Sequence, residues 1–533
     1  MRRTLLVLTL ALGILSATFH AQNPPRLVVV LVVDQMRADY LKTFDRHWRG
    51  GFRSLLDEGL VFENARYPYL TTMTCPGHST ISTGTFPRTH GMVNNTWWDP
   101  GTRRMEGCTA DPDSPDITYG RPVRLGNSAK ALLVPTLADE LRGQRPGARV
   151  VSLSHKARSA IGLAGHAGDA VVWFDDAGGS FATSRAFAPR PVPAVKAFID
   201  RDPYERDAWR VWNLMAPVDT YLMRDAGVGE RPPAPWTGLF PHAVTGRDGI
   251  DTQFFNLWQA SPMADAYLAR MAESLIDSLA LGQRDTTDFL GISFSVLDEV
   301  GHYFGPQSRE VEDVLRQLDL TLHALIAYLD AKIGRSNYVL ALSADHGVAL
   351  TAVAPTGGRI ANDDVRDRVN ETLTAQFGPP QRGSYVNSSN FTDLFLADGV
   401  FDRLTRTPAA MNALEHALRE LPGIERVLRA DQLSETSHDP VVRAAALSHR
   451  AGRSGDLVLV PKQHWYFSAR NATTATTHGT MHDYDRHVPL ILFGGGIPHG
   501  LDRAAATPAD IAPTLASRVG IRLPNAEGRV LVK

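Results

Sequence analysis

The sequence predicts an α/β fold in which a doubly wound, mainly parallel central sheet is flanked by helices. Several short segments are continuous runs of apolar and β-branched residues, the pattern of parallel strands that are buried on both faces. Segments with apolar residues at helical spacing lie between these runs, and such alternation is typical of this sheet. The composition agrees, because 533 residues with 43% hydrophobic and 21% charged residues can bury a large globular core.

The first predicted strand is the clearest, since Leu27 to Val33 is an unbroken apolar run. Further strands are predicted at 149–154, 289–297, 338–343 and 488–493. The clearest helix is predicted over 311–333, where apolar residues recur on one face and Gly334 follows as a stop signal. In a sheet of this kind ligands bind beyond the carboxyl ends of the strands, so polar residues placed there are expected to converge.

Two long stretches fit this alternation poorly, at about 162–283 and at about 352–463. The first is rich in tryptophan, proline and aspartate. We interpret both as insertions into one catalytic domain that covers 22–533. We expect them to decorate the sheet and to form a cap over its site.

The first residues have the pattern of a secretory signal. Arg2 and Arg3 precede the apolar run 5–15, and small residues follow up to Ala21. We therefore predict a signal peptide at 1–21 and a periplasmic or secreted location. The run is short for a bilayer span and no other stretch qualifies, so no membrane insertion is expected after cleavage. An uncleaved anchor is the alternative.

Charge and cysteine content narrow the possible partners. The net charge is -2, so no nucleic-acid partner is implied. Cys75 and Cys108 are the two cysteines, too few for a disulfide scaffold or a zinc–thiolate site. They could pair in an exported protein, and the sequence leaves both this pairing and the oligomeric state open.

Three aspartates and three histidines lie at or beyond the ends of apolar runs. They are Asp34, Asp298, His302, Asp345, His346 and His478. Carboxylates and neutral imidazoles are the ligands of catalytic zinc, and six are enough for two metal ions with open coordination positions. Two metal ions can stabilise both the attacking and the leaving oxygen of a displacement at phosphorus. The set therefore predicts phosphoryl chemistry.

The segment from Thr71 to His78 contains the candidate nucleophile. Pro76 suits the first turn of a helix, so we expect Thr74 just before that helix, near its partially positive end. A helix N-terminus and a metal ion both lower the pKa of a hydroxyl, which favours Thr74 as the nucleophile. Thr72 is the competing nucleophile, and a capping role for Thr74 is the alternative without chemistry.

Two basic residues follow the predicted strand at 149–154. Lys156 and Arg158 are two positions apart, so in extended chain they would point to one side. A guanidinium can bind a phosphoryl group with two hydrogen bonds, and an ammonium adds a point charge. Taken alone, such a pair is more often solvated surface.

Together these motifs resemble the alkaline phosphatase superfamily, and most of all its bacterial PafA-type alkaline phosphatases, which use a threonine nucleophile. The resemblance runs from Asp34 to His478 and rests on seven features in the same order. They are the aspartate after the first strand, T-x-P-G-H, N-N-x-W-W-D, S-x-K-x-R-S-A, D-x-x-G-H-x-x-G-P, A-D-H-G and T-x-H-G. The family often has aspartate at the position of Ala157. This chain departs from that pattern but keeps both neighbouring cations, Lys156 and Arg158.

The resemblance implies two zinc ions and three phosphate contacts. One zinc ion would be held by Asp34, Thr74, Asp345 and His346, and the other by Asp298, His302 and His478. The phosphoryl oxygens would be held by Lys156, Arg158 and Asn95. Two alternatives stay open from the residues alone: Asn94 in place of Asn95, and His482 in place of His478.

The expected activity is hydrolysis of small-molecule phosphate monoesters through a covalent phosphothreonine. The alternative is a phosphodiesterase of the nucleotide pyrophosphatase kind, which shares the metal ligands but lacks a matching Lys-x-Arg pair. A sulfatase is excluded, because Cys75 is followed at once by Pro76 and Ser79 stands where an arginine would be needed. A binding protein without turnover would require loss of the nucleophile, a ligand or a phosphate contact, and none is missing.

Overall fold

The computed structural model describes residues 24–123, 125–353, 357–381 and 383–532. The predicted signal peptide at 1–21 lies outside the described residues. Within the ranges given, no helix is both long enough and apolar enough to cross a bilayer.

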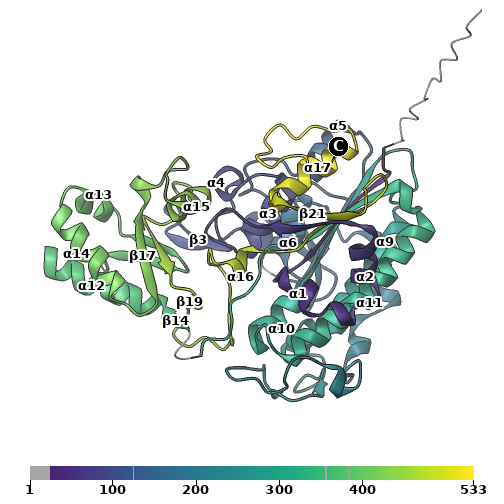
Figure 1. Cartoon of the computed structure of the whole chain (residues 1–533), viewed down its shortest axis with the longest axis horizontal. Helices are drawn as coiled ribbons and strands as arrows, with labels where there is room; N and C mark the ends of the chain where they lie inside the picture. The colour runs from purple at the N-terminus through teal and green to yellow at the C-terminus, as the bar shows by residue number, and fades with distance from the viewer. Residues whose placement is uncertain (1–23, 124, 354–356, 382, 533) are drawn as a thin grey trace, which may run out of the picture.

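An eleven-stranded sheet forms the centre of the molecule (Figure 1). Its strands in spatial order are β21 (Gly500–Ala506), β2 (Leu60–Ala65), β20 (Leu490–Gly494), β13 (Tyr338–Ser343), β1 (Leu27–Val33), β12 (Asp288–Phe294), β7 (Val150–Ser154), β8 (Ala170–Asp175), β9 (Ser180–Ser184), β5 (Ala110–Thr118) and β6 (Gly126–Asn127). The strands from β13 to β8 are parallel. Antiparallel pairs begin on either side, at β20 and at β9. The predicted α/β class is confirmed, with a parallel centre and mixed edges.

Both faces of the sheet are buried, which explains the unbroken apolar run of β1. Val29 and Leu31 pack into one core and Val28 and Val30 into another, because successive side chains of a strand point to opposite faces. The helices that contribute to the first core include α2 (Gly51–Glu58), α9 (Pro262–Ser278), α10 (Val296–Phe304) and α11 (Arg309–Lys332). Those of the second are α3 (Thr74–Thr83), α5 (Leu137–Gln144), α6 (Ala157–Ala164) and α17 (Ile511–Arg518).

The predicted boundaries agree with the structure to within a few residues. β1 and β13 coincide with the runs at 27–33 and 338–343, and α11 corresponds to the predicted helix. The predicted strand at 289–297 is too long, because β12 ends at Phe294 and α10 begins at Val296. The predicted strand at 488–493 is β20, which runs antiparallel to β13. An apolar run indicates burial of a strand but not its direction.

The stretch at 162–283 is only partly an insertion. Its first residues complete α6, and β8 and β9 then extend the central sheet. All residues of β8 are buried, as expected of a core strand. The predicted boundary is therefore too early, and the residues that leave the sheet follow β9.

The stretch at 352–463 forms a separate lobe with its own core, seen at the left of Figure 1. A four-stranded antiparallel sheet is built from β15 (Val386–Asn390), β16 (Asp393–Leu396), β18 (Leu457–Pro461) and β17 (Ile424–Arg429). It packs with α12 (Asn362–Phe377) and α14 (Pro408–Arg419). A short parallel pair, β14 (Gly358–Ala361) with β19 (Trp465–Ser468), joins the beginning of the lobe to the segment that leaves it.

Candidate active site

The predicted site residues meet where neighbouring parallel strands end. Asp34 directly follows β1, and Asp345 lies just beyond β13. Asp298 is in the first turn of α10, which follows β12. Lys156 lies just beyond β7. Because β13, β1, β12 and β7 are adjacent in the sheet, residues far apart in sequence are brought to one edge.

Six of the predicted metal ligands form two groups. The first metal group is Asp34, Asp345 and His346, and the second metal group is Asp298, His302 and His478. Within each group the ligand atoms all lie within 4.8 Å of one another. The rings of His346 and His478 stack with their centroids 3.4 Å apart, so the two groups are neighbours.

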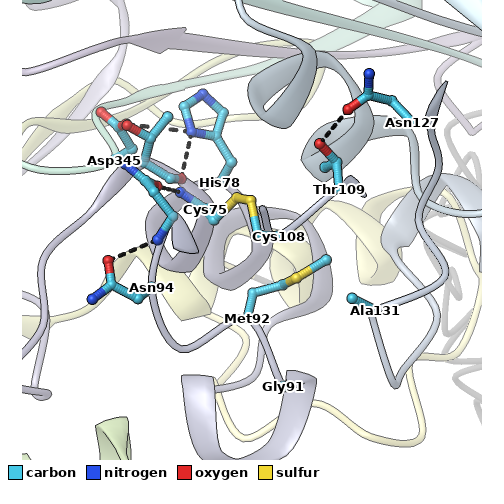
Figure 2. The surroundings of a disulfide bond; sticks show 12 residues. Cys75, His78, Gly91, Met92, Asn94, Cys108, Thr109, Asn127, Ala131 and Asp345 are labelled. Atoms are coloured by element: carbon cyan, nitrogen blue, oxygen red, sulfur yellow. Dashed lines mark hydrogen bonds and ion pairs between the residues drawn. A yellow bond between two sulfur atoms is a disulfide. The ribbon is translucent and has the colours of Figure 1, made fainter. Parts of the chain in front are cut away.

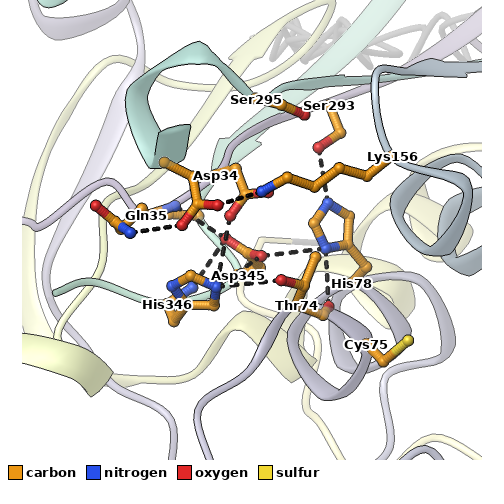
Figure 3. Close-up of polar contacts among 12 residues, drawn as sticks. Asp34, Gln35, Thr74, Cys75, His78, Lys156, Ser293, Ser295, Asp345 and His346 are labelled. Atoms are coloured by element: carbon orange, nitrogen blue, oxygen red, sulfur yellow. Dashed lines mark hydrogen bonds and ion pairs between the residues drawn. The ribbon is translucent and has the colours of Figure 1, made fainter. Parts of the chain in front are cut away.

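In each metal group, one atom lies close to ligand atoms of the other two residues. Nε2 of His346 lies 3.4 Å from Oδ1 of Asp34 and 3.2 Å from Oδ2 of Asp345 (Figure 3). Oδ1 of Asp298 lies 3.2 Å from Nε2 of His302 and 3.8 Å from Nε2 of His478. The predicted partition of the six ligands into two sets of three is therefore the one that the geometry supports.

The two groups fit divalent cations. Oδ1 of Asp34 and Oδ2 of Asp345 are buried and accept no hydrogen bond from any described residue. Burial raises the pKa of Asp34 well above its usual value, and the neighbouring carboxylates of Asp298 and Asp345 add to this effect. A buried carboxylate oxygen that accepts no hydrogen bond is costly unless a positive charge lies near it. A metal ion would supply that charge, and the carboxylate and imidazole donors are those of zinc sites.

The histidines are oriented for metal binding by backbone carbonyls. Nδ1 of His302 donates to the carbonyl of Thr476 (2.9 Å), and Nδ1 of His478 donates to that of Thr72 (3.0 Å). A carbonyl can only accept, so each ring keeps its proton on Nδ1 and directs Nε2 to its group. The rival His482 instead has Nε2 3.0 Å from the carbonyl of Pro461, outside both groups.

Thr74 is the first residue of α3, whereas it was predicted to lie just before that helix. The helix begins at Thr74 itself, and Pro76 lies in its first turn. Oγ1 of Thr74 lies 3.5 Å from Nε2 of His346, beside the first metal group. Thr72 is engaged elsewhere, because its hydroxyl donates to the carbonyl of Thr480 (2.7 Å). The contacts therefore favour Thr74 over Thr72 as the nucleophile.

Lys156 lies between the two metal groups. Nζ donates to Oδ2 of Asp34 over 2.7 Å (Figure 3). It also donates to Oδ2 of Asp298. Burial opposes the charge, but the carboxylates of Asp298 and Asp34 raise the pKa of Lys156 above its usual value. The side chain is thus a permanent cation at the junction of the groups.

Arg158 does not have the extended backbone that was predicted for it. Lys156 has extended backbone, but Arg158 lies in the first turn of α6 rather than in extended chain. Its Nε is buried and makes no hydrogen bond with any described residue. A buried guanidinium nitrogen without a partner is suited to an incoming anion.

Comparisons with known proteins agree with this geometry. Residues 28–485 match the family described as type I phosphodiesterase / nucleotide pyrophosphatase. Alkaline phosphatase PafA of Elizabethkingia meningoseptica is 31% identical over 95% of this chain and 93% of its own length. The crystal structure of wild-type PafA superposes with a TM-score of 0.86 and 29% identity, covering 95% of this chain and 98% of that one. The chain is a PafA-type member of the alkaline phosphatase superfamily.

A second alkaline phosphatase and a more distant solved structure are also similar to the chain. Alkaline phosphatase PhoV of Synechococcus elongatus is also 31% identical, over 95% of this chain and 92% of its own length. Murine ectonucleotide pyrophosphatase / phosphodiesterase 5 is similar in structure with a TM-score of 0.55 and 14% identity, over 94% of this chain and 97% of that one. That likeness concerns the fold alone.

The N-N-x-W-W-D motif contains both candidate amides, Asn94 and Asn95. Oδ1 of Asn95 accepts a hydrogen bond from the backbone N–H of Cys75 (2.9 Å), which leaves the amide NH₂ group free to donate. Asn94 is buried, and its Oδ1 accepts from the backbone N–H of Asn95 (2.8 Å). A backbone N–H thus holds the amide oxygen of each asparagine, and Nδ2 of Asn94 is buried without a partner among the described residues, so the choice of Asn95 as the substrate contact stays a prediction.

A disulfide joins Cys75 to Cys108, which settles a pairing that the sequence left open (Figure 2). Cys75 is adjacent to Thr74 on α3. The backbone N–H of Cys108 donates to the carbonyl of Asn95 (2.9 Å). The bridge therefore links the nucleophile helix to the segment that carries the amide.

The sequence reasoning missed Gln35, which connects the two metal groups. Its backbone N–H donates to Oδ1 of Asp345 (3.1 Å), and its side-chain amide donates to Oδ1 of Asp298. The residue has a left-handed backbone, with φ of 70°. A Cβ on Gly301 would lie 1.9 Å from Oε1 of Gln35, so the glycine of D-x-x-G-H provides the space for this side chain. Gly301 is therefore the feature of the sequence that could have indicated a side chain packed closely against α10.

His78 is a second residue whose role was not predicted. Nδ1 lies 2.9 Å from the carbonyl of Thr74 and 3.3 Å from Oδ2 of Asp345, and Nε2 lies 2.8 Å from Oγ of Ser293 (Figure 3). It therefore connects the first turn of α3 to a ligand of the first metal group. A Cβ on Gly77 would lie 2.3 Å from the carbonyl oxygen of Asp345, so T-x-P-G-H encodes a close approach of these two segments.

Proposed function

We propose that the chain hydrolyses phosphate monoesters through a covalent phosphothreonine formed on Thr74, with two zinc ions bound at the two metal groups. The chain is a phosphomonoester hydrolase of the alkaline phosphatase superfamily by its relationship to PafA and PhoV. The observation that carries the proposal is the position of Lys156, whose Nζ contacts both Asp34 and Asp298 beside Thr74. A cation at that point faces any phosphoryl group that approaches the nucleophile.

Asp34, Thr74, Asp345 and His346 would hold one zinc ion, and Asp298, His302 and His478 would hold the other. When bound, the two ions supply positive charge that acidifies the nucleophile hydroxyl and stabilises the leaving oxygen. The assignment of zinc is supported by the mixed imidazole and carboxylate donors, and by the open position that the three protein ligands of the second group would leave.

The chemical steps on the protein follow from the position of Thr74. Its Oγ1 gives up its proton to solvent and attacks phosphorus, so that a bond to Thr74 forms while the bond to the leaving oxygen breaks. The leaving oxygen takes a proton from water and departs as the alcohol. Water then attacks the phosphothreonine, which releases inorganic phosphate and restores the hydroxyl. The positive end of the α3 dipole favours the negative charge on Oγ1 in the first step.

Lys156, Arg158 and Asn95 would stabilise charge on the three non-bridging oxygens in a loose transition state. The two cations explain the preference for monoesters. A monoester dianion offers more charge to these groups than a diester monoanion does. The diesterase alternative would leave Arg158 without a purpose, although its buried Nε has no partner among the described residues.

We further propose that the substrates are small molecules and that the chain acts in the periplasm or outside the cell. The signal-like pattern at 1–21 supports export. The Cys75–Cys108 disulfide supports the same location, because disulfides persist in oxidising compartments.

A comparison of three substrates on one preparation tests the proposal. Initial rates would be measured on an aryl phosphate monoester, an aryl phosphate diester and an aryl sulfate, together with the metal content. We expect two zinc ions per chain and a monoester rate far above the other two. A diester rate equal to or above the monoester rate would contradict the proposed function.

A further inference from the structure

The loop at 471–478 has neither helix nor strand, yet it supplies His478 and supports His302. The backbone N–H of Ala475 donates to the carbonyl of His302 (2.6 Å), and the carbonyl of Thr476 accepts from Nδ1 of the same histidine (2.9 Å). Two of the three ligands of the second metal group thus depend on the course of this loop. An irregular segment keeps such a course only when other groups hold it.

Arg359 holds the loop from the lobe. Its Nη2 donates to the carbonyl of Ala475 (2.8 Å) and also to that of Thr474. Arg359 is the second residue of β14, whose pairing with β19 anchors its backbone. The guanidinium therefore fixes two consecutive carbonyls immediately before the Thr476 carbonyl that orients His302.

Tyr466 makes a second side-chain hydrogen bond to the same part of the loop. Its hydroxyl donates to the same carbonyl of Ala475 (2.8 Å), and the side chain is fully buried. The guanidinium carbon of Arg359 lies 5.2 Å from the centroid of the Tyr466 ring. A planar cation that stacks on an aromatic ring while donating to two carbonyls has little freedom to move.

The stretch at 162–283 contributes a second arginine to the same loop. Nη1 of Arg231 donates to the carbonyl of Ala472 (2.5 Å). The backbone N–H of Arg231 donates to the carbonyl of Tyr303 (2.7 Å), and Tyr303 follows His302 on α10. The loop is therefore held both by Arg359 of the lobe and by Arg231 of the segment between β9 and β12.

We propose that Arg359 is a positioning residue for the second metal group. It holds the loop at 471–478 so that His302 and His478 direct Nε2 toward the same cation. The role rests on the proposed function, since it presupposes that this group binds zinc. It assigns the lobe a part in metal binding in addition to any covering of the site.

Zinc uptake by metal-stripped protein tests this role without measuring turnover. The wild-type chain would be titrated with zinc in competition with a coloured chelator, and His302→Ala would identify the step that belongs to the second metal group. We expect Arg359→Gln to weaken that step about ten-fold or more and to leave the other step unchanged, because groups that orient metal ligands commonly contribute this much.

Arg368→Gln is the matched control. Arg368 also donates to a backbone carbonyl within the lobe, that of Ala417 (2.9 Å), but it does not touch the loop. Both zinc steps should match the wild type in this variant. Equal weakening of both steps in Arg359→Gln, or no weakening of either, would overturn the proposed role. If the wild-type chain itself shows no second step, the proposed function fails together with it.

Two further variants keep the test sharp if Arg359→Gln folds poorly. Tyr466→Phe removes one hydroxyl that donates to Ala475 and should weaken the same zinc step in the same direction. Arg359→Lys keeps the charge but not the two-carbonyl geometry, so it should restore only part of the affinity. In cobalt-substituted protein, the visible spectrum of the second group should change in Tyr466→Phe, and an unaltered spectrum and affinity would contradict the proposal.

Discussion

The backbone N–H of Cys75 donates a hydrogen bond of 2.9 Å to Oδ1 of Asn95. The residue next to the proposed nucleophile thus fixes the amide that is proposed to bind a phosphoryl oxygen. The same helix turn positions both the attacking atom and one of the groups that stabilise the charge it creates.

Replacement of Asn95 should therefore affect turnover more than folding. Asn95→Ala removes one donor to a charged oxygen, a bond that contributes about 1.5–3 kcal/mol. We expect kcat/KM for a monoester to fall by about 10- to 100-fold and the free energy of unfolding to fall by only about 1 kcal/mol, because the backbone N–H of Cys75 loses its acceptor. Asn94→Ala is the control, since Asn94 is buried and supports its neighbour, and should mainly lower stability. The reverse pattern would favour Asn94 as the substrate contact.

Removal of the disulfide should lower both stability and activity. The bridge spans 33 residues, so its loss from a chain with both Cys75→Ala and Cys108→Ala should cost about 3–4 kcal/mol. Because the bridge tethers Asn95 to the nucleophile helix, kcat/KM should also fall at temperatures where the variant is fully folded. Urea unfolding and monoester kinetics would measure the two effects. Wild-type kinetics in the folded variant would show that the bridge does not position Asn95.

Thr74→Ala should abolish turnover while leaving the fold intact, because Thr72 is held by the carbonyl of Thr480 and cannot replace it. Thr74→Ser keeps a hydroxyl and should retain measurable activity. Acid quenching during turnover, followed by mass spectrometry, should find phosphate on the peptide that contains Thr74. Near-wild-type rates in Thr74→Ala would eliminate this residue as the nucleophile.

Lys156→Ala and Arg158→Ala should reduce monoester hydrolysis far more than diester hydrolysis. Each removes a cation that a dianion uses more fully than a monoanion, and we expect a loss of at least about 100-fold on monoesters. Parallel kinetics on matched aryl esters would give the ratio. Equal losses on both esters would argue against the monoester preference. Lys332→Ala, which removes a partly exposed lysine paired with Asp277 on the surface, is the control and should affect neither.

Acid should destabilise the fold through His90. Burial, with help from Arg453, lowers the pKa of His90 to about 3. Its Nδ1 accepts a hydrogen bond from the backbone N–H of Met92 (3.1 Å), which requires the neutral ring. Below a pH of about 6.5 the unfolded chain gains a proton that the folded chain does not. The stability contributed by neutral His90 is therefore lost as the pH falls from 6.5 toward 3.

Urea unfolding of metal-stripped protein at pH 7.5 and pH 5 measures this effect. The wild type should lose about 2 kcal/mol more between the two conditions than His90→Gln does. His499→Gln is the control, because His499 is exposed, and should follow the wild type. If His90→Gln and the wild type lose the same stability, the acid sensitivity has another origin.

The sequence allowed the central sheet and most of the candidate site to be predicted because both depend on local patterns. A strand buried on both faces admits few polar residues, so β1 could be read directly from Leu27 to Val33. The ligands stand at or beyond the ends of such runs, and the order of the strands then brings them together. The direction of β20 could not be read, since burial alone does not specify it.

Other features could not be predicted because they depend on contacts between distant segments. Gln35 acts through a left-handed backbone, and the glycine that provides its space, Gly301, lies 266 positions away and does not by itself identify which side chain fills that space. Arg359 binds the carbonyl of Ala475 across 116 residues, and a carbonyl has no side-chain signature. Backbone acceptors of this kind are invisible to motif reasoning.

The spread of the ligands along the chain has a consequence for biosynthesis. Asp34 belongs to the first strand of the sheet, whereas His478 arrives only after the whole lobe has been made. A nascent chain made as far as His346 contains all three residues of the first metal group, but it still lacks His478 of the second. The two metal groups are therefore completed at different times during synthesis. A chain that ends before His478 can complete the first group but not the second.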